Sequence, residues 1–380
     1  MTKVWKKLVV IWLIAVIVLP LMTGMQVWAK TEPKQLDILF THDTHSHLNS
    51  FTTIVNGEKK EAGGFAKLKT LIDEHKKVNP DTLVLDGGDF SMGTLIQTVY
   101  DTEAAELRML GQIGCDVTTL GNHEFDYQSK GLADMLNAAK NSGDTVPSLV
   151  LCNVDWDAME EAGLSEGQKQ IQSAFEKYQV KDYVVVQKGN IKIAVLVYLE
   201  KMHLSVLQPV NWYGKIPVKA AKQTVEKIKK KEKVDMIACV SHSGTWDDAD
   251  KSEDEILAKE VPDIDLIISG HTHSQLDKPI QHGNTYIVSC GEYGKNLGTI
   301  SMTQKDDGRW KATSYELIPV SDEVNPDETT QAKIERINGY GRYKLSCKVW
   351  IYKKRVLAEN DIEFNSLDEM GTKHEEFKSW

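Results

Sequence analysis

Five short segments of the chain carry His, Asp and Asn side chains that could bind metal ions, and each segment closely follows an apolar run. They are Asp43-Thr44-His45, Gly88-Asp89, the GNHEFD run at Gly121–Asp126, Ser241-His242-Ser243, and the GHTH run at Gly270–His273. If the apolar runs are strands of open α/β sheets, the loops at their carboxyl ends meet at one edge. We therefore expect these side chains to converge on one site.

Seven of these side chains are candidate metal ligands: Asp43, His45, Asp89, Asn122, His242, His271 and His273. Seven nitrogen and oxygen donors without a thiolate are too many for one tetrahedral zinc ion. They suit two divalent ions about 3.5–4 Å apart that share a carboxylate. Two such ions lower the pKa of a bridging water and hold both oxygens of an in-line displacement, which favours hydroxide attack at the phosphorus of an ester. The mixed donors favour Mn, Zn, Fe or Co over Mg or Ca.

The five segments in this order resemble the calcineurin-like metallophosphoesterase superfamily. Within it, they are similar to the secreted 5′-nucleotidase family, which includes UDP-sugar hydrolases and 2′,3′-cyclic-nucleotide phosphodiesterases. The resemblance covers residues 36–300, and its most specific parts are the GNHEFD and GHTH runs. It implies a metal-dependent phosphoric ester hydrolase with two divalent metal ions and a nucleotide or another small phosphate ester as substrate.

The resemblance also implies a role for each motif residue. One metal ion would be bound by Asp43, His45 and His273, and the other by Asn122, His242 and His271. Asp89 would bridge the two ions. His123 matches the catalytic histidine of the family, which stabilises charge on the phosphoryl group or protonates the leaving oxygen. Asp126 matches the carboxylate that orients this histidine.

Several residues near the motifs are expected to support the site. The last ligand position, His273 here, holds Gln in some members of the family. We expect His42 and His47 to support the ligands or to face solvent, and Glu124 and Phe125 to pack and to hold their loop.

Apolar runs alternate with amphipathic stretches along the chain, which predicts an α/β fold. The first unit joins a strand at Leu36–Thr41, a helix at Gly64–Val78 and a strand at Thr82–Leu85. A single helix is predicted over Glu103–Ile113, and a polar, helix-prone insertion over residues 156–180. The resemblance implies that this fold is the four-layer α-β-β-α sandwich of the metallophosphoesterase type.

The last part of the predicted domain consists of strands without helices between them. These strands are Thr285–Cys290, Gly298–Gln304 and Trp310–Pro319, and a hairpin earlier in the chain turns at Gly189-Asn190. The segment Gly291–Gly298 is interpreted as a turn into the closing strands, with a role at the substrate end of the cleft as the alternative. Residues 30–320 thus form one predicted catalytic domain.

The N-terminus is typical of a secretory signal peptide. Lys3, Lys6 and Lys7 precede the uncharged run Leu8–Met22, and a small-residue cleavage site ends at Ala29. We predict that residues 1–29 are removed and that the protein is secreted or held in the cell envelope, without a stable membrane span. An uncleaved membrane anchor is the alternative, but the run is short and contains a proline.

Composition and charge narrow the classes of partner. The 380 residues include 45 Lys and Arg against 55 Asp and Glu, for a net charge of −10. No global positive field attracts nucleic acid, so nucleic acid is not an expected partner. The five cysteines are odd in number and have no CxxC spacing, which favours small buried side chains, with one disulfide as the alternative.

The C-terminal part departs most from the family. Residues 321–380 are interpreted as a polar, acidic linker, Ser321–Thr330, followed by the incomplete start of a second nucleotidase domain. The basic stretch Arg336–Arg355 fits neither part well. Such a short segment cannot bury a core of its own, so we expect it to be disordered or to lie on the catalytic domain.

The preferred hypothesis is a secreted dimetal phosphoesterase with 5′-nucleotidase-like activity. Within the same class, a nucleotide phosphodiesterase or a UDP-sugar pyrophosphatase is the alternative. A second class is a non-catalytic truncated product that binds metal. The third class is a nucleic-acid-binding protein that uses Arg336–Arg355.

Overall fold

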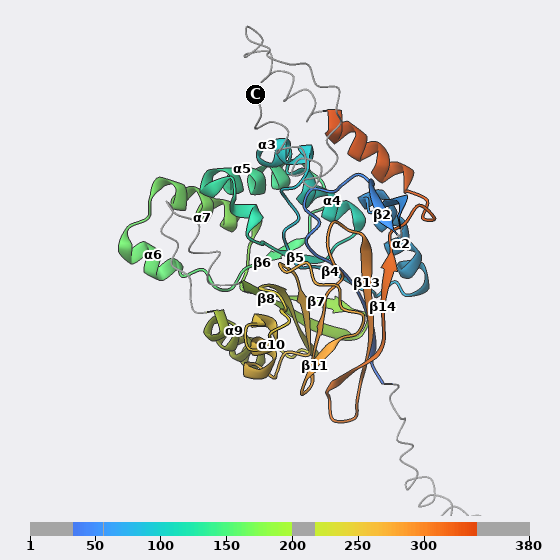
Figure 1. Ribbon diagram of the computed structural model, residues 1–380. Coiled ribbons are helices and arrows are strands. Elements are labelled where there is room, and N and C mark those ends of the chain that lie inside the picture. Colours follow the sequence, from blue (N-terminus) through green and yellow to red (C-terminus); the bar gives the residue numbers. More distant parts are fainter. Residues whose placement is uncertain (1–32, 56, 200–216, 340–380) are drawn as a thin grey trace, which may run out of the picture. The chain divides into compact units, whose positions relative to one another are not determined.

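The computed structural model describes residues 33–55, 57–199 and 217–339 (Figure 1). The predicted signal segment, residues 1–29, lies outside the described residues, as does most of the basic stretch Arg336–Arg355. Within the described part of the chain, no helix is long and apolar enough to cross a membrane.

The first of two six-stranded sheets combines four parallel strands with an antiparallel pair. Its order is β14 (Trp310–Pro319), β13 (Asn296–Gln304), β1 (Gln35–Thr41), β4 (Leu83–Asp86), β5 (Val117–Thr119) and β6 (Ser148–Val150). Strands β1, β4, β5 and β6 are parallel, whereas β13 is antiparallel to both β1 and β14. The parallel strands therefore all end at the same edge.

The second sheet also has four parallel strands, with one antiparallel strand at each edge. Its order is β11 (Ile280–His282), β12 (Thr285–Val288), β10 (Leu266–Ser269), β9 (Met236–His242), β8 (Ile191–Leu199) and β7 (Tyr183–Lys188). Strands β8, β9, β10 and β12 are parallel, and the predicted β7–β8 hairpin is confirmed. Candidate ligands follow β9 and β10, in the middle of this sheet.

Strand β8 shows how the layers are stacked. Its sequence, IKIAVLVYL, is apolar at almost every position, which is typical of a parallel strand buried on both faces. Ile193 and Val195 belong to a core shared with the first sheet, whereas Ala194 and Leu196 belong to a second core with the helices of the second sheet. Helices thus cover the outer faces of two packed sheets (Figure 1), and the α-β-β-α prediction is confirmed.

The helices lie in two groups. The group beside the first sheet comprises α2 (Phe65–Val78), α3 (Tyr100–Glu103), α4 (Ala105–Ile113), α5 (Gln128–Asn141), α6 (Trp156–Ala162) and α7 (Glu166–Tyr178), with short 3₁₀ turns η1 (Leu95–Val99) and η2 (His123–Phe125). The group beside the second sheet comprises α9 (Pro217–Lys231) and α10 (Glu253–Glu260). Helices α6 and α7 confirm the helix-prone insertion.

The helix predicted over Glu103–Ile113 is confirmed as α4, and it begins two residues later than expected because the chain breaks at Ala104. This residue has left-handed backbone with φ 46°, and it separates α3 from α4. On either side of the break, Tyr100 donates to the carbonyl of Glu124 and Glu106 accepts from Ser46. The loops that contain Glu124 and Ser46 thus bond the chain before and after the break. They hold α3 and α4 in two directions, which one continuous helix would not provide.

The hairpin of β2 (Phe51–Val55) and β3 (Glu58–Ala62) is not expected from the sequence. Strand β3 reads EKKEA and is almost entirely exposed, so it has no alternation of apolar and polar residues to detect. It pairs with β2 in antiparallel register from Phe51 opposite Ala62 to Val55 opposite Glu58.

The chain beyond Pro319 packs on the sandwich. Residues 328–339 form a helix in the segment where a linker and further sequence were expected. Ile334 and Ile337 are buried in the main core, Lys333 pairs with Asp144 at 3.0 Å, and Asn338 bonds Asn49. The described part of this segment therefore lies on the domain, which was one of the two expectations.

Candidate metal centre

The predicted convergence of the five segments is confirmed. Asp43 and His45 follow β1, Asp89 follows β4, and Asn122 follows β5 in the first sheet. The remaining candidates end β9 or follow β10 in the second sheet. They are His242, His271 and His273. Within each sheet the carboxyl ends of the parallel strands share one edge. The packing of the two sheets on a common core then brings these two edges together.

The first cluster consists of Asp43, His45 and His273. The Nε2 atoms of the two histidines are 3.0 Å apart, and they lie 3.8 Å and 3.5 Å from Oδ1 of Asp43. The two facing ring nitrogens can share only one proton between them. A cation bound by both nitrogens and by the Asp43 carboxylate would therefore satisfy these three groups better than hydrogen bonds do. The donor set fits a divalent metal ion.

The second cluster consists of Asn122, His242 and His271. Oδ1 of Asn122 lies 3.2 Å from Nε2 of His242 and 3.2 Å from Nδ1 of His271. His271 presents Nδ1 to the amide oxygen, whereas His242 presents Nε2. The two rings come from different segments, namely the end of β9 and the loop after β10. This arrangement of imidazole and amide donors also fits a divalent ion.

Asp89 lies between the two clusters. Its Oδ2 is 3.0 Å from Nε2 of His242 and 3.9 Å from Nε2 of His45. The backbone N–H of His123 donates to the other oxygen at 2.9 Å. The carboxylate is therefore fixed where it can contact an ion in either cluster, as a bridging ligand must.

Charge and burial oppose each other at this centre. Burial raises the pKa of Asp89, yet neighbouring His242 lowers it to about 2. Burial lowers the pKa of His242, yet Asp89 and Asp43 raise it to about 10. Without other cations, the carboxylates are thus balanced by protonated imidazole, and a bound metal ion would replace this proton.

The backbone of the site is strained. Five of the seven candidate ligands have left-handed backbone, namely Asp43, His45, Asp89, His271 and His273, with φ between 46° and 75°. Left-handed backbone is uncommon for residues other than glycine, and it persists only where the surroundings enforce it. Such a concentration in three loops is typical of a functional site.

His123 and Asp126 lie at the rim rather than among the buried ligands. Nδ1 of His123 donates to Oδ2 of Asp126 at 2.7 Å, and the side chains are 39% and 40% exposed. This hydrogen bond raises the pKa of His123. The His123 ring centroid lies 5.2 Å from that of His45, so the pair borders the first cluster.

The residues expected to support the site do so. Nε2 of His42 accepts from the backbone N–H of Cys290 at 2.7 Å, so its Nδ1 carries the proton donated to Asp43. Buried His47 contacts the His45 carbonyl through Nδ1. The buried carboxylate of Glu124 accepts from the backbone N–H groups of Asp89 and Gly121, and this joins the loops after β4 and β5.

Two further acids that brace the strand ends were not found from the sequence. Asp86 accepts from the hydroxyls of Thr41 and Thr118, and thereby ties β1 and β5 to β4. Asp254 of α10 accepts from Ser241, which adjoins His242, and from Ser269, which lies two residues before His271. Each sheet thus has a buried acid that bonds hydroxyl groups of its strand ends. Glu292, in the segment interpreted as a turn, contacts His273 and was also missed.

The pH dependence of stability tests the buried state of Asp254. Burial raises its pKa to about 6, although Ser241 and Ser269 donate to it. In metal-free protein between about pH 4 and pH 6, the folded state keeps a proton that the unfolded state has lost, so this contribution to stability disappears as the pH rises. Asp254→Asn has no such proton. Its free energy of unfolding relative to wild type should therefore rise by about 3 kcal/mol from about pH 4 to pH 8. Urea unfolding at several pH values measures this, and a constant difference would contradict it.

The four described cysteines are buried and free, as small core side chains are.

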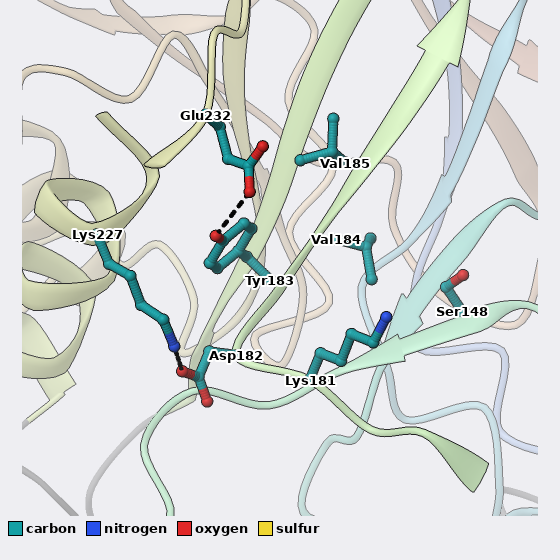
Figure 2. Close-up of a pocket in the computed structure, with 8 residues that line it drawn as sticks. All are labelled: Ser148, Lys181, Asp182, Tyr183, Val184, Val185, Lys227 and Glu232. Atoms are coloured by element: carbon teal, nitrogen blue, oxygen red, sulfur yellow. Dashed lines mark hydrogen bonds and ion pairs between the residues drawn. The ribbon is translucent and has the colours of Figure 1, made fainter. Parts of the chain in front are cut away.

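A separate surface groove of about 650 Å³ borders the edge strand β7 and α9 (Figure 2). Among its lining residues, Lys227 contacts Asp182 at 2.6 Å, and Tyr183 donates to Glu232. No candidate ligand lines this groove, so it is distinct from the metal centre.

Comparison with known proteins agrees with the geometry. Residues 36–275 match the calcineurin-like phosphoesterase family. Among curated proteins, the trifunctional nucleotide phosphoesterase YfkN of Bacillus subtilis is 28% identical over 319 residues, which are 79% of this chain and 20% of YfkN. The protein UshA of Yersinia enterocolitica is 27% identical over 342 residues, 82% of this chain and 55% of UshA. The chain thus spans about half the length of UshA and a smaller share of YfkN.

Solved structures share the fold. The 5′-nucleotidase precursor of Thermus thermophilus superposes with a TM-score of 0.67 at 23% identity, covering 86% of this chain and 61% of that protein. The calcineurin-like phosphoesterase YfkN of Bacillus subtilis gives a TM-score of 0.64 at 22% identity, covering 82% of this chain and 99% of that chain. At these identities, the likeness establishes the architecture around the site.

Proposed function

Because the chain belongs to the calcineurin-like phosphoesterase family, we propose that it is a dimetal phosphoesterase that hydrolyses nucleotide phosphate esters, with 5′-nucleotidase-like activity. The observation that carries this proposal is the placement of Asp89 between two clusters of nitrogen and oxygen donors. The match to relatives described as 5′-nucleotidases supports a nucleotide as the substrate.

Each side chain has a distinct task in this proposal. The first cluster would hold one divalent ion, the second cluster would hold the other, and Asp89 would be within reach of both. When bound, such ions supply a water of lowered pKa and neutralise the charge of the phosphate group. Manganese, zinc, iron and cobalt all suit the donors. His42 and Glu124 keep the ligands in place, since they bond Asp43 and the backbone of Asp89.

His123 supplies the proton chemistry. Its Nδ1 is held by Asp126, so its other nitrogen is free of that bond and can donate to an oxygen of the substrate. Because the pair lies at the half-exposed rim, it can reach a leaving oxygen that points away from the buried ligands. The imidazole protonates this oxygen or stabilises charge on the phosphoryl group.

A broader substrate range is the second candidate. The name of YfkN describes a trifunctional nucleotide phosphoesterase, so a similar catalytic half is compatible with more than one nucleotide ester. A nucleotide phosphodiesterase or UDP-sugar pyrophosphatase would use the same ligands and the same His123–Asp126 pair. The two candidates differ in the leaving group and not in the metal centre.

We also propose that the protein is exported. This rests on Lys3, Lys6, Lys7 and the uncharged run Leu8–Met22, which lie outside the described residues. N-terminal sequencing of the protein recovered from expressing cells tests it, and a mature chain beginning at Lys30 is the expected result.

Metal removal and a substrate panel test the proposed function. Chelator-treated protein should not hydrolyse bis-aryl phosphate, AMP, cyclic nucleotide or UDP-glucose, because the pKa of the attacking water then returns to its bulk value. Added Mn²⁺ or Zn²⁺ should restore turnover, and AMP should be the best substrate if the 5′-nucleotidase proposal is right. A higher rate with the cyclic nucleotide or UDP-glucose would favour the second candidate. Tight uptake of two metal ions without any turnover would favour a non-catalytic, metal-binding product.

A further inference from the structure

The carboxylate of Glu292 lies between a candidate ligand and a cation. Its Oε2 is 2.5 Å from Nδ1 of His273, and its Oε1 accepts from Nζ of Lys295 at 2.8 Å. Each oxygen thus has its own partner. Since Nδ1 of His273 faces Glu292, Nε2 of the same ring faces Asp43 and His45 in the first cluster.

The turn that carries Glu292 is anchored on both sides. The backbone N–H of Gly291 donates to Ser274, and that of Tyr293 donates to the carbonyl of Asp43 at 2.7 Å. Tyr293 has left-handed backbone with φ 58°, which is unusual for a bulky side chain and requires support from its surroundings. The turn is therefore fixed directly to a residue of the first cluster.

The histidines that turn Nε2 towards the clusters differ in the partner of Nδ1. Nδ1 of His45 contacts the backbone carbonyl of Met92 at 3.0 Å, and Nδ1 of His242 contacts that of Gly87 at 2.9 Å. His273 instead has a charged side-chain acceptor. A carboxylate on the outer nitrogen fixes the tautomer of a metal-binding histidine and increases the basicity of the inner nitrogen more than a carbonyl does.

We propose that Glu292 is a positioning residue that sets the metal affinity of the first cluster through His273, separately from the second cluster. This inference rests on the proposed function, because it requires two metal ions. Glu292 keeps the Nδ1 proton of His273 on its outer side and leaves the Nε2 lone pair for the ion. Lys295 holds the carboxylate in the orientation that this bond requires.

Zinc titration of the full-length, chelator-treated protein tests the inference. Two binding steps are expected for wild type. In Glu292→Ala, one step should weaken about 10–100-fold and the other should stay unchanged. Asn122→Ala should weaken the opposite step, which assigns the two steps to the clusters. Glu292→Gln retains an acceptor oxygen without the charge, so its loss should be smaller than that of Glu292→Ala.

A matched control is available in α10. Glu255 contacts Nε2 of His282 at 2.6 Å, so Glu255→Ala removes a similar pair that touches no candidate ligand, and both zinc steps should remain as in wild type. Unchanged zinc affinities in Glu292→Ala, or equal loss in both steps, would overturn the inference while the proposed function stands. Failure of wild type to bind two zinc ions would instead overturn the proposed function.

Discussion

Asp89→Ala is expected to remove the shared ligand of both metal sites and to lower turnover about 10⁴-fold or more. The carboxylate is buried, and one of its oxygens faces both His45 and His242. Its loss removes the proposed bridging ligand and leaves Asp43 as the remaining carboxylate among the candidate ligands. Ligands that act as a unit lose nearly all of their effect when one member is removed. The metal content should fall from two ions per chain to less than one, as measured by elemental analysis after dialysis.

A control for this variant lies at the opposite end of the second sheet. Asp265 precedes β10 and accepts from the backbone N–H of Ile237, far along the strand from the ligands that follow β10. Asp265→Ala removes a largely buried carboxylate that has no donor of the metal centre as a partner. It should keep two ions and wild-type turnover. If Asp89→Ala also kept two ions, Asp89 would not be the bridge.

The convergence of the ligands could be predicted from the sequence because it depends on local order. Each motif follows or ends an apolar strand, and parallel strands bring their loops to one edge of their own sheet, which groups β1, β4 and β5 in the first sheet and β9 and β10 in the second. The GNHEFD and GHTH runs then point to individual residues. The prediction therefore needed only the chain order of strands and motifs.

The supporting acids could not be predicted, because their partners are set by tertiary structure. Asp254 lies in EDEILAKE, which reads as an exposed, charged helix, yet its carboxylate is buried between Ser241 and Ser269. Glu292 lies in a glycine-rich segment that indicates only a turn. The start of α4 after Ala104 also lies beside tertiary contacts, since Tyr100 and Glu106 bond distant loops.

His123→Ala is expected to lower turnover of AMP about 10²–10⁴-fold while two metal ions remain bound. The side chain is half-exposed at the rim, and the hydrogen bond that fixes Asp89 comes from the backbone N–H of His123, which the variant keeps. If His123 protonates the leaving oxygen, the loss should be much smaller for an aryl phosphate, whose leaving oxygen needs no proton, than for AMP. An equal loss for both substrates would assign His123 to charge stabilisation. Wild-type turnover in His123→Ala would contradict any catalytic role.

The pH profile of Asp126→Asn separates orientation from direct catalysis. The hydrogen bond to Asp126 raises the pKa of His123, so the protonated imidazole persists to higher pH in wild type. Activity that needs this proton falls as the pH rises through the pKa of His123. In Asp126→Asn this pKa is lower, and the alkaline decline of kcat should therefore begin at lower pH, with both metal ions retained. Because a change in metal binding would alter the profile through metal occupancy, the profile is recorded at saturating metal. An unshifted alkaline limb would show that His123 does not act as the acid.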